Sequence, residues 1–195
     1  MIFRRSLAAV ALAPLLLAGC VSLGPEPPER LLTLMPTQPM AAGTTMTGAT
    51  ENALGVLEPE TPAALAVTRV PVRVENASLA YLQDAVWAER PARLFQHLLA
   101  ETIRVRRNRL VLDEAPLLYA APTKLDGKLL EMGYDAASSS AVVRFDALLT
   151  LPGGEVRTQR FEAIVPGVTA DPAAVGSALN QAANQVAYQI ADWIN

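Results

Sequence analysis

Two side chains that could do covalent chemistry occur once each, because Cys20 is the only cysteine and His97 the only histidine. A zinc or copper site needs several such ligands together. A serine nucleophile would have to take His97 as its base, but we expect His97 at the solvent edge of a helix's apolar face. Gly-x-Ser-x-Gly and Gly-rich phosphate motifs are also missing from the sequence. The sequence therefore predicts a protein that is not an enzyme and that uses neither metal nor cofactor.

The chemistry that does suit Cys20 is modification of its thiol. Two arginines precede an apolar stretch over residues 7–18, which ends in Leu17-Ala18-Gly19-Cys20. This order is typical of a secretory signal peptide, and about 12 apolar residues are too few for a membrane span, which takes roughly 20. The last four residues resemble the lipobox of bacterial lipoproteins, in which the cysteine receives acyl chains such as palmitate and becomes the new amino terminus. We predict a signal peptide over residues 1–19 and lipidation of Cys20.

A tether follows the cysteine. Three of residues 21–29 are prolines, so residues 20–29 favour extended polyproline conformations at about 3.1 Å per residue. The domain would then stay within roughly 30 Å of the bilayer. Val21 stands where an aspartate favours inner-membrane retention in enteric bacteria, which predicts the periplasmic face of the outer membrane.

Composition narrows the class of protein. The chain of 195 residues carries 16 Lys and Arg against 19 Asp and Glu, and loss of the leader would make it more acidic. An acidic chain is a poor ligand for nucleic acid and lacks a basic patch for anionic lipids. With its single cysteine acylated, it can form no disulfide. The length suits one domain, over residues 30–195.

The first half predicts short strands and one helix. Strands are expected over residues 31–35, 53–57 and 66–74, with Pro71 at an edge or a bulge, a loop over 36–52, and irregular or extended structure over 77–89. Pro91 begins a helix whose apolar stripe runs from Leu94 to Ile103. We interpret the cations that end it as a helix terminus and solvated face, with a binding patch as the alternative; they are Arg104, Arg106, Arg107 and Arg109.

The second half predicts a three-stranded meander and a long helix. After a short strand over 109–112, strands are expected over 123–134 (with bulges or close approaches at Gly127 and Gly133), 141–151 and around 161–165. Asp171 and Pro172 begin a helix that continues to about residue 194. Its polar face is almost uncharged, which fits either an interface or a plain polar surface; it consists of Ser177, Asn180, Gln181, Asn184, Gln185 and Gln189.

The order and spacing of several segments resemble a known family. They are Tyr81, Trp87-Ala88-Glu89, Pro91, the helix over residues 94–103, Leu125-Asp126-Gly127 and the helix over 182–193. The chain resembles the ABC-type transport auxiliary lipoproteins of the paraquat-inducible protein C type, over nearly all of its length after the tether. The resemblance implies an α+β fold similar to the TolB N-terminal domain, with a small mixed or antiparallel sheet packed by two main helices.

The resemblance also implies a function and partners. Such lipoproteins work with an MCE-domain protein and an ABC transporter (permease and ATPase) that moves lipids or other hydrophobic molecules between the two membranes. An envelope lipoprotein that activates or organises a cell-wall synthase or secretion pore is the alternative, and a homo-oligomer is left open. Tyr81 and Trp87 are the predicted partner-binding residues, because interface hot spots are rich in Tyr and Trp. The alternative for Trp87 is a place in the core beneath the helix.

Overall fold

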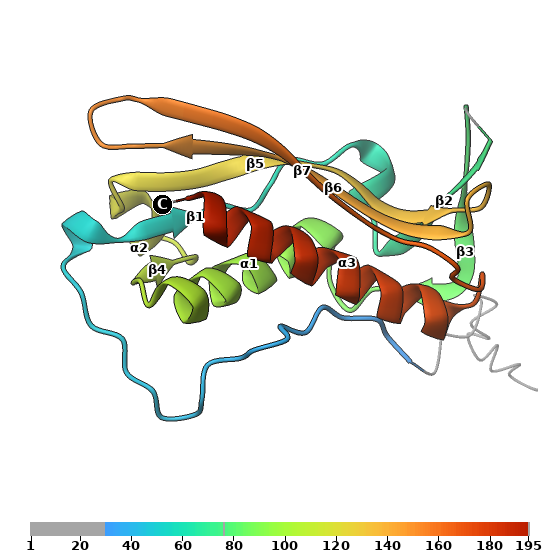
Figure 1. Ribbon diagram of the computed structural model, residues 1–195, viewed down its shortest axis with the longest axis horizontal. Coiled ribbons are helices and arrows are strands. Elements are labelled where there is room, and N and C mark those ends of the chain that lie inside the picture. Colours follow the sequence, from blue (N-terminus) through green and yellow to red (C-terminus); the bar gives the residue numbers. More distant parts are fainter. Residues whose placement is uncertain (1–29, 76, 195) are drawn as a thin grey trace, which may run out of the picture.

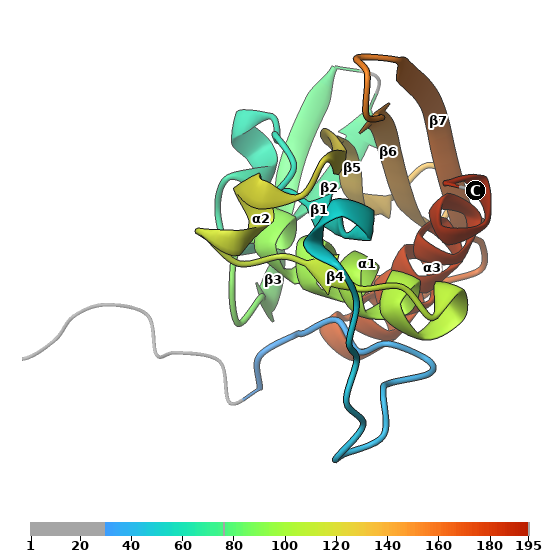
Figure 2. The same ribbon diagram turned by 90° about the vertical axis from the view of Figure 1, so that its left-hand side faces the viewer.

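The computed structural model describes residues 30–75 and 77–194. The predicted signal peptide (1–19) and the predicted acylated Cys20 with its tether (20–29) lie outside the described residues. The domain has three layers, shown in Figures 1 and 2: a twisted β-sheet, two long helices on one of its faces, and residues 30–49 running across the far side of those helices. The predicted fold class, a mixed sheet packed by two main helices, is confirmed.

Seven strands form the sheet, and β5 joins them. β5 pairs with β6 along its length and β6 pairs with β7, so the predicted antiparallel meander is confirmed. On its other edge β5 pairs in parallel with β1 near one end and with β2 near the other. The strands are β1 (Leu54–Val56), β2 (Arg69–Glu75), β3 (Ser78–Val86), β4 (Val111–Leu112), β5 (Thr123–Asp135), β6 (Ser140–Thr150) and β7 (Val156–Val165).

The long helices begin as their sequences predict. In α1 (Pro91–Arg107), proline occupies the first turn and Asn108 ends the helix in the left-handed conformation, with φ 47°. In α3 (Pro172–Trp193), the Asp171 carboxylate accepts hydrogen bonds from the main-chain N–H groups of Ala173 and Ala174 at 3.1 and 3.0 Å. Such a cap satisfies donors that the first helical turn leaves free. The shorter helices are η1 (Thr50–Asn52), η2 (Ala63–Leu65) and α2 (Leu117–Ala120).

The core lies between the sheet and the two long helices. The predicted stripe of α3 is buried, with Leu179, Val186 and Ile190 each 0% exposed. Phe95 of α1 packs on Phe145 of β6 with ring centroids 5.2 Å apart. Burial of such side chains contributes about 1.5–3 kcal/mol each to folding. Packing of one apolar face against another therefore holds the domain without a disulfide.

Some predicted elements differ from the structure. Residues 31–35 form only an isolated bridge, from Leu32 to Trp87, and not a strand. Residues 77–89, for which the sequence predicts irregular or extended structure, contain the extended strand β3, the partner of β2. The register shift near Pro71 confirms a bulge there. In β5 the shift falls after Leu129, and the two glycines of this strand are close approaches instead.

Candidate interaction surface

The two predicted partner-binding residues lie in different environments. Trp87 is 1% exposed and belongs to the same buried cluster as Leu94 and Phe95 of α1. Its indole Nε1 is buried without a hydrogen-bond partner among the described residues. Its side chain is almost fully buried, so Trp87 lies in the core, which is the alternative position that the sequence analysis gives for it.

Tyr81, in β3, is not part of this buried cluster. Its hydroxyl donates to the main-chain carbonyl of Ala64 in η2 at 3.4 Å, and the Arg69 guanidinium lies 4.3 Å from its ring centroid. Asp84, with φ 55°, and a register shift separate Tyr81 from Trp87 along the strand. The structure therefore does not bring the two aromatic side chains together. Tyr81 remains half-buried, and Leu79 beside it is 64% exposed.

A row of alternating charges crosses the sheet on the face away from the helices. Arg73 of β2 contacts Glu131 of β5, and Arg144 of β6 contacts both Glu131, at 2.7 Å, and Glu162 of β7. The Glu131 side chain is only 15% exposed, so this carboxylate is held between two guanidinium groups. The sequence pattern did not reveal this row, because the pairing depends on the register of four strands.

A second row with the opposite order of signs runs beside the first. Glu60 contacts Lys128 of β5 at 3.1 Å, and Lys128 lies opposite Asp146 of β6. Asp146 accepts two hydrogen bonds from Arg160 of β7 at 2.6 and 2.7 Å. We call the two rows together the charge grid; it consists of Arg73, Glu131, Arg144, Glu162, Glu60, Lys128, Asp146 and Arg160.

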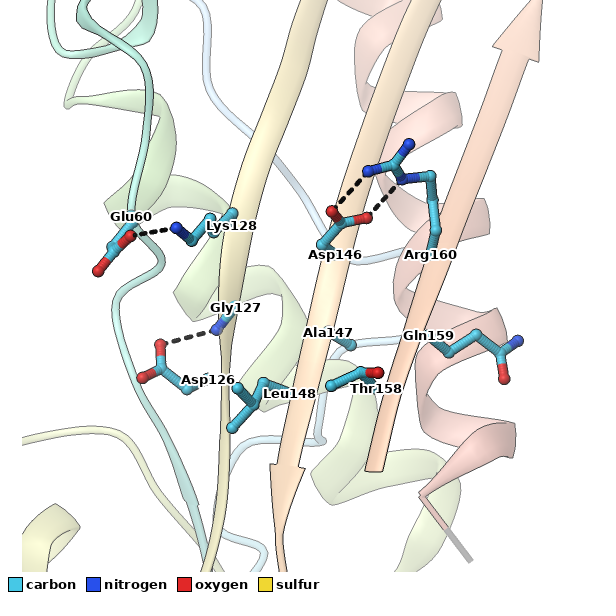
Figure 3. Close-up of a pocket in the computed structure, with 10 residues that line it drawn as sticks. All are labelled: Glu60, Asp126, Gly127, Lys128, Asp146, Ala147, Leu148, Thr158, Gln159 and Arg160. Atoms are coloured by element: carbon cyan, nitrogen blue, oxygen red, sulfur yellow. Dashed lines mark hydrogen bonds and ion pairs between the residues drawn. The ribbon is translucent and has the colours of Figure 1, made fainter. Parts of the chain in front are cut away.

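The second row surrounds a hollow of about 590 Å³ on this face, shown in Figure 3. Leu148, Thr158 and Gln159 line it between the charged groups. Gly127 lies at its base, where an added Cβ would collide with the Asp146 carbonyl and the Phe145 ring. β5 and β6 can therefore pack this closely only with glycine at this position.

The hollow is suited to binding more than to proton transfer. The hydrogen bonds from Arg160 hold the pKa of the Asp146 carboxyl below its usual value, and the same bonds raise the pKa of the Arg160 guanidinium. Asp146 is therefore ionised and already occupied at neutral pH. In residues 30–75 and 77–194, no three His, Cys, Asp or Glu side chains form a group that could hold a metal ion.

The single histidine lies apart from this face. His97 is on α1, its side chain is 38% exposed, and its Nδ1 lies 3.6 Å from an oxygen of Asp113. It thus lies at the solvent edge of the helix, as the sequence predicts.

The amide-rich face of α3 binds part of its own chain. The side-chain oxygen of Asn184 accepts from the main-chain N–H of Thr37 at 2.8 Å, and its nitrogen donates to the Met35 carbonyl at 2.9 Å. The Asn180 oxygen accepts from the Met35 N–H at 2.8 Å. Met40 extends the contact to α1 by donating to Glu101 at 2.7 Å. We call residues 31–40 the strap. Part of the amide-rich face is therefore an interface, and it is formed with the protein's own chain.

Comparison with known proteins decides the family. The family model described as ABC-type transport auxiliary lipoprotein component matches residues 33–191. The chain belongs to this family. The matched part of this auxiliary lipoprotein begins within the strap and ends near the end of α3, so it contains the charge grid and the helix layer.

Solved structures share the fold of this auxiliary lipoprotein. The protein XCC0632 from Xanthomonas campestris is similar with a TM-score of 0.70 and 18% identity, over 85% of this chain and 94% of that one. An uncharacterized protein is similar with a TM-score of 0.65 and 14% identity, over 78% and 97% of the two chains. No curated protein matches the chain in sequence. In the described part of the auxiliary lipoprotein, no helix has both the length and the apolar character that a membrane crossing requires.

Proposed function

We propose that this auxiliary lipoprotein is anchored by Cys20 to the periplasmic face of the outer membrane, where it docks an ABC-type system that moves lipids or other hydrophobic molecules between the membranes. The observation that carries the proposal is the family match over residues 33–191. Its partners are then an MCE-domain protein and, through it, the permease and ATPase. The protein acts by binding and not by catalysis.

The surfaces of the domain support a docking role. The charge grid gives a polar face whose charges are already paired, so a partner meets fixed hydrogen-bonding groups and no unbalanced charge. The exposed Leu79, close to the half-buried Tyr81, adds an apolar contact at one end of the sheet. Interfaces combine such apolar anchors with a polar rim.

The anchor is tested with Cys20→Ala. Each buried methylene of an acyl chain contributes about 0.8 kcal/mol to membrane binding, so loss of the acyl chains should leave an unprocessed or soluble form. The measurements are incorporation of labelled palmitate and fractionation on a density gradient. Palmitate labelling and outer-membrane fractionation that persist in Cys20→Ala would refute the anchor.

The partner is tested by pull-down of the MCE-domain protein from the same system with the full-length lipoprotein. Leu79→Ser and Tyr81→Ala should weaken the recovery, whereas the matched control Tyr119→Ala, an exposed tyrosine on α2, should not. Recovery of a cell-wall synthase or a secretion pore in place of the MCE-domain protein would overturn the transport assignment. Unchanged recovery with both Leu79→Ser and Tyr81→Ala would show that the docking surface does not include β3.

A further inference from the structure

β7 forms one edge of the sheet, and no strand in the described part of the chain pairs with its outer side. It pairs with β6 over all 10 of its residues without a register shift, and Figure 2 shows it as the outermost strand on its side. At the opposite edge, β3 is interrupted by Asp84, with φ 55°, and by register shifts. Bulges and prolines protect an exposed edge from pairing with another chain, and residues 156–165 contain neither.

The groups that β7 presents at this edge follow from the alternation of an antiparallel ladder. Beside the β6–β7 turn, the Leu151 N–H donates to the Glu155 carbonyl at 2.8 Å. Hydrogen-bonded pairs recur at every second position, so the odd-numbered residues of β7 bond to β6. The N–H and C=O groups of the even-numbered residues point outward; these are Val156, Thr158, Arg160, Glu162 and Ile164. A long contact of 3.5 Å from the Gln189 side chain to the Glu162 carbonyl agrees with this direction.

Both rows of the charge grid end on β7, and they end with opposite signs. The first row ends at Glu162, which binds Arg144, and the second ends at Arg160, which binds Asp146. The two terminal side chains lie two positions apart, so they share one face of the strand. They are 37% and 62% exposed, and the sheet has no further described strand beyond them. The edge therefore presents a base and an acid side by side.

We propose that β7 pairs antiparallel with β7 of a second copy of this chain, about a two-fold axis centred on Phe161. In this register each Arg160 lies opposite the partner's Glu162, and the outward N–H and C=O groups of these residues hydrogen-bond to each other. Each row then continues into the partner's other row, so bases and acids alternate across both sheets. A centre shifted by one residue would place two Arg160 or two Glu162 side chains opposite each other, which destabilises pairing. Charge complementarity thus favours a second copy and fixes its register.

The helix layer leaves room for this pairing. α3 packs beneath both β6 and β7, and strands lie about 4.8 Å apart, so two copies of α3 would lie about 10 Å apart. Helices pack at about this distance. The end of α3 lies near the edge, because the Trp193 ring packs against Phe161 with centroids 5.6 Å apart. Gln189 is exposed and uncharged there, and Asp192 is already bound by Arg106.

The arrangement is compatible with the proposed anchor and docking surface. A two-fold axis perpendicular to the sheet keeps both helix layers on the same side. The strap crosses the far side of those helices, so both chains lead toward one bilayer. Leu79 and Tyr81 lie on β3, at the other edge of the sheet. The proposal therefore holds whichever partner the auxiliary lipoprotein serves.

The test exchanges charges between two full-length copies, co-expressed with different affinity tags and purified in a nonionic detergent. Retrieval of one tag should recover the other copy, and sedimentation velocity should give two copies per particle. Arg160→Glu in both copies should lower the recovery about tenfold or more, because like charges then lie opposite each other. Glu162→Arg in both copies should do the same. Arg157→Glu, which changes a residue opposite the partner's Val165, is the matched control and should leave recovery unchanged.

The decisive arm combines the two variants. Arg160→Glu in one copy and Glu162→Arg in the other place opposite charges at both positions, so recovery should return. It would also show that both variants fold. A parent that sediments as a single copy would overturn the proposal and leave the edge to an extended segment of another protein. Association that neither variant weakens would overturn it as well, as would a mixed pair that does not associate although both variants retain the circular dichroism of the parent.

A second measurement covers the case in which the charge variants do not fold. Thr158 and Ile164 are exposed on β7, and the proposed register places Thr158 opposite the partner's Ile164. The Cα atoms of such a pair lie about 5.5 Å apart, which a disulfide can span. Thr158→Cys in one copy should therefore form a disulfide with Ile164→Cys in the other under mild oxidation. Absence of this cross-link in the paired variants would overturn the register and with it the proposal.

Discussion

The two polar faces of this domain differ in composition and in the contacts that they make. On the sheet, long charged side chains bind one another in the charge grid and remain largely open to solvent. On α3, short neutral amides bind the main chain of the strap, and Asn184 is only 4% exposed. The charged side chains thus contact one another across the sheet, whereas part of the amide face is covered by the strap.

The difference follows from the chemistry of the side chains. Exposed ion pairs contribute little to stability, about 0–1 kcal/mol each, because solvent screens them and side-chain entropy opposes them. An amide carries both donors and an acceptor, so it can satisfy the N–H and C=O groups of an extended segment. Burial of such a pair carries no cost for desolvating a charge. An uncharged polar helix face therefore indicates contact with backbone.

The largest effect is expected on the side of α3 that faces the sheet. Leu179 is 0% exposed, so Leu179→Ala should lower the free energy of unfolding by about 2–5 kcal/mol, through lost burial and the cavity left behind. Urea denaturation followed by circular dichroism measures it. The effects of substitutions at the two polar faces are compared with this loss of unfolding free energy. A loss below about 1 kcal/mol would place α3 outside the core.

Asn184→Ala should have the next largest effect. It leaves the Thr37 N–H and the Met35 carbonyl without their partner, and an unsatisfied group costs about 1–3 kcal/mol when water does not replace the bond. We expect a loss of about 1–3 kcal/mol and faster proteolysis within the strap. Gln185→Ala, an exposed amide of the same helix, is the control and should change stability by less than about 0.5 kcal/mol. Equal effects of the two substitutions would contradict a specific role for Asn184.

Glu131→Gln should be the most costly change in the charge grid. It removes the carboxylate that two arginines share, at a side chain that is 15% exposed, and we expect a loss of about 1–2 kcal/mol. Glu162→Gln, at 37% exposure with one arginine partner, should cost less than about 1 kcal/mol. The two denaturation midpoints measure the difference. The reverse order would show that the grid is not centred on β5.

The smallest effect concerns pH. The folded-state pKa of Asp146 is lowered by Arg160, so its contribution to stability is present above the unfolded pKa of about 3.9. It is lost as pH falls through the lower folded pKa. The difference in urea midpoint between the parent and Asp146→Asn should be constant above about pH 5 and shrink below about pH 4. If the difference in urea midpoint did not change with pH, titration of Asp146 would make no contribution to the pH dependence of stability.

Elements that carry their own local signals could be predicted from the sequence. Asp171 and Pro172 mark the start of α3, and the alternation in residues 141–151 marks β6, because each signal is contained in a few neighbouring residues. The sequence of β3 does not distinguish a strand from irregular structure, because most of its residues are exposed and Asp84 interrupts its period. β1 and β4 span only three and two residues. Strands this short do not display the alternation of apolar and polar residues by which a strand is predicted.

The polar contacts on the two faces join residues that are distant in sequence, so the sequence alone does not predict them. Glu131 meets Arg73 and Arg144 only through the pairing of three strands. Asn184 binds Thr37 of the strap across a separation of 147 positions in the sequence. Cys20 lies in a contiguous motif, so sequence alone could suggest its lipidation, which stays a prediction.

The strap has a mechanical consequence. If Cys20 is anchored, any force between bilayer and domain enters at residues 31–37, which are hydrogen-bonded to Asn180 and Asn184 and bridged through Leu32 to the end of β3. The load then passes into α3 and into the buried cluster that contains Trp87. The charge grid lies off this path on the opposite face. Under the proposed anchoring, a pull from the membrane would therefore not distort the charge grid, which belongs to the face that we propose for docking.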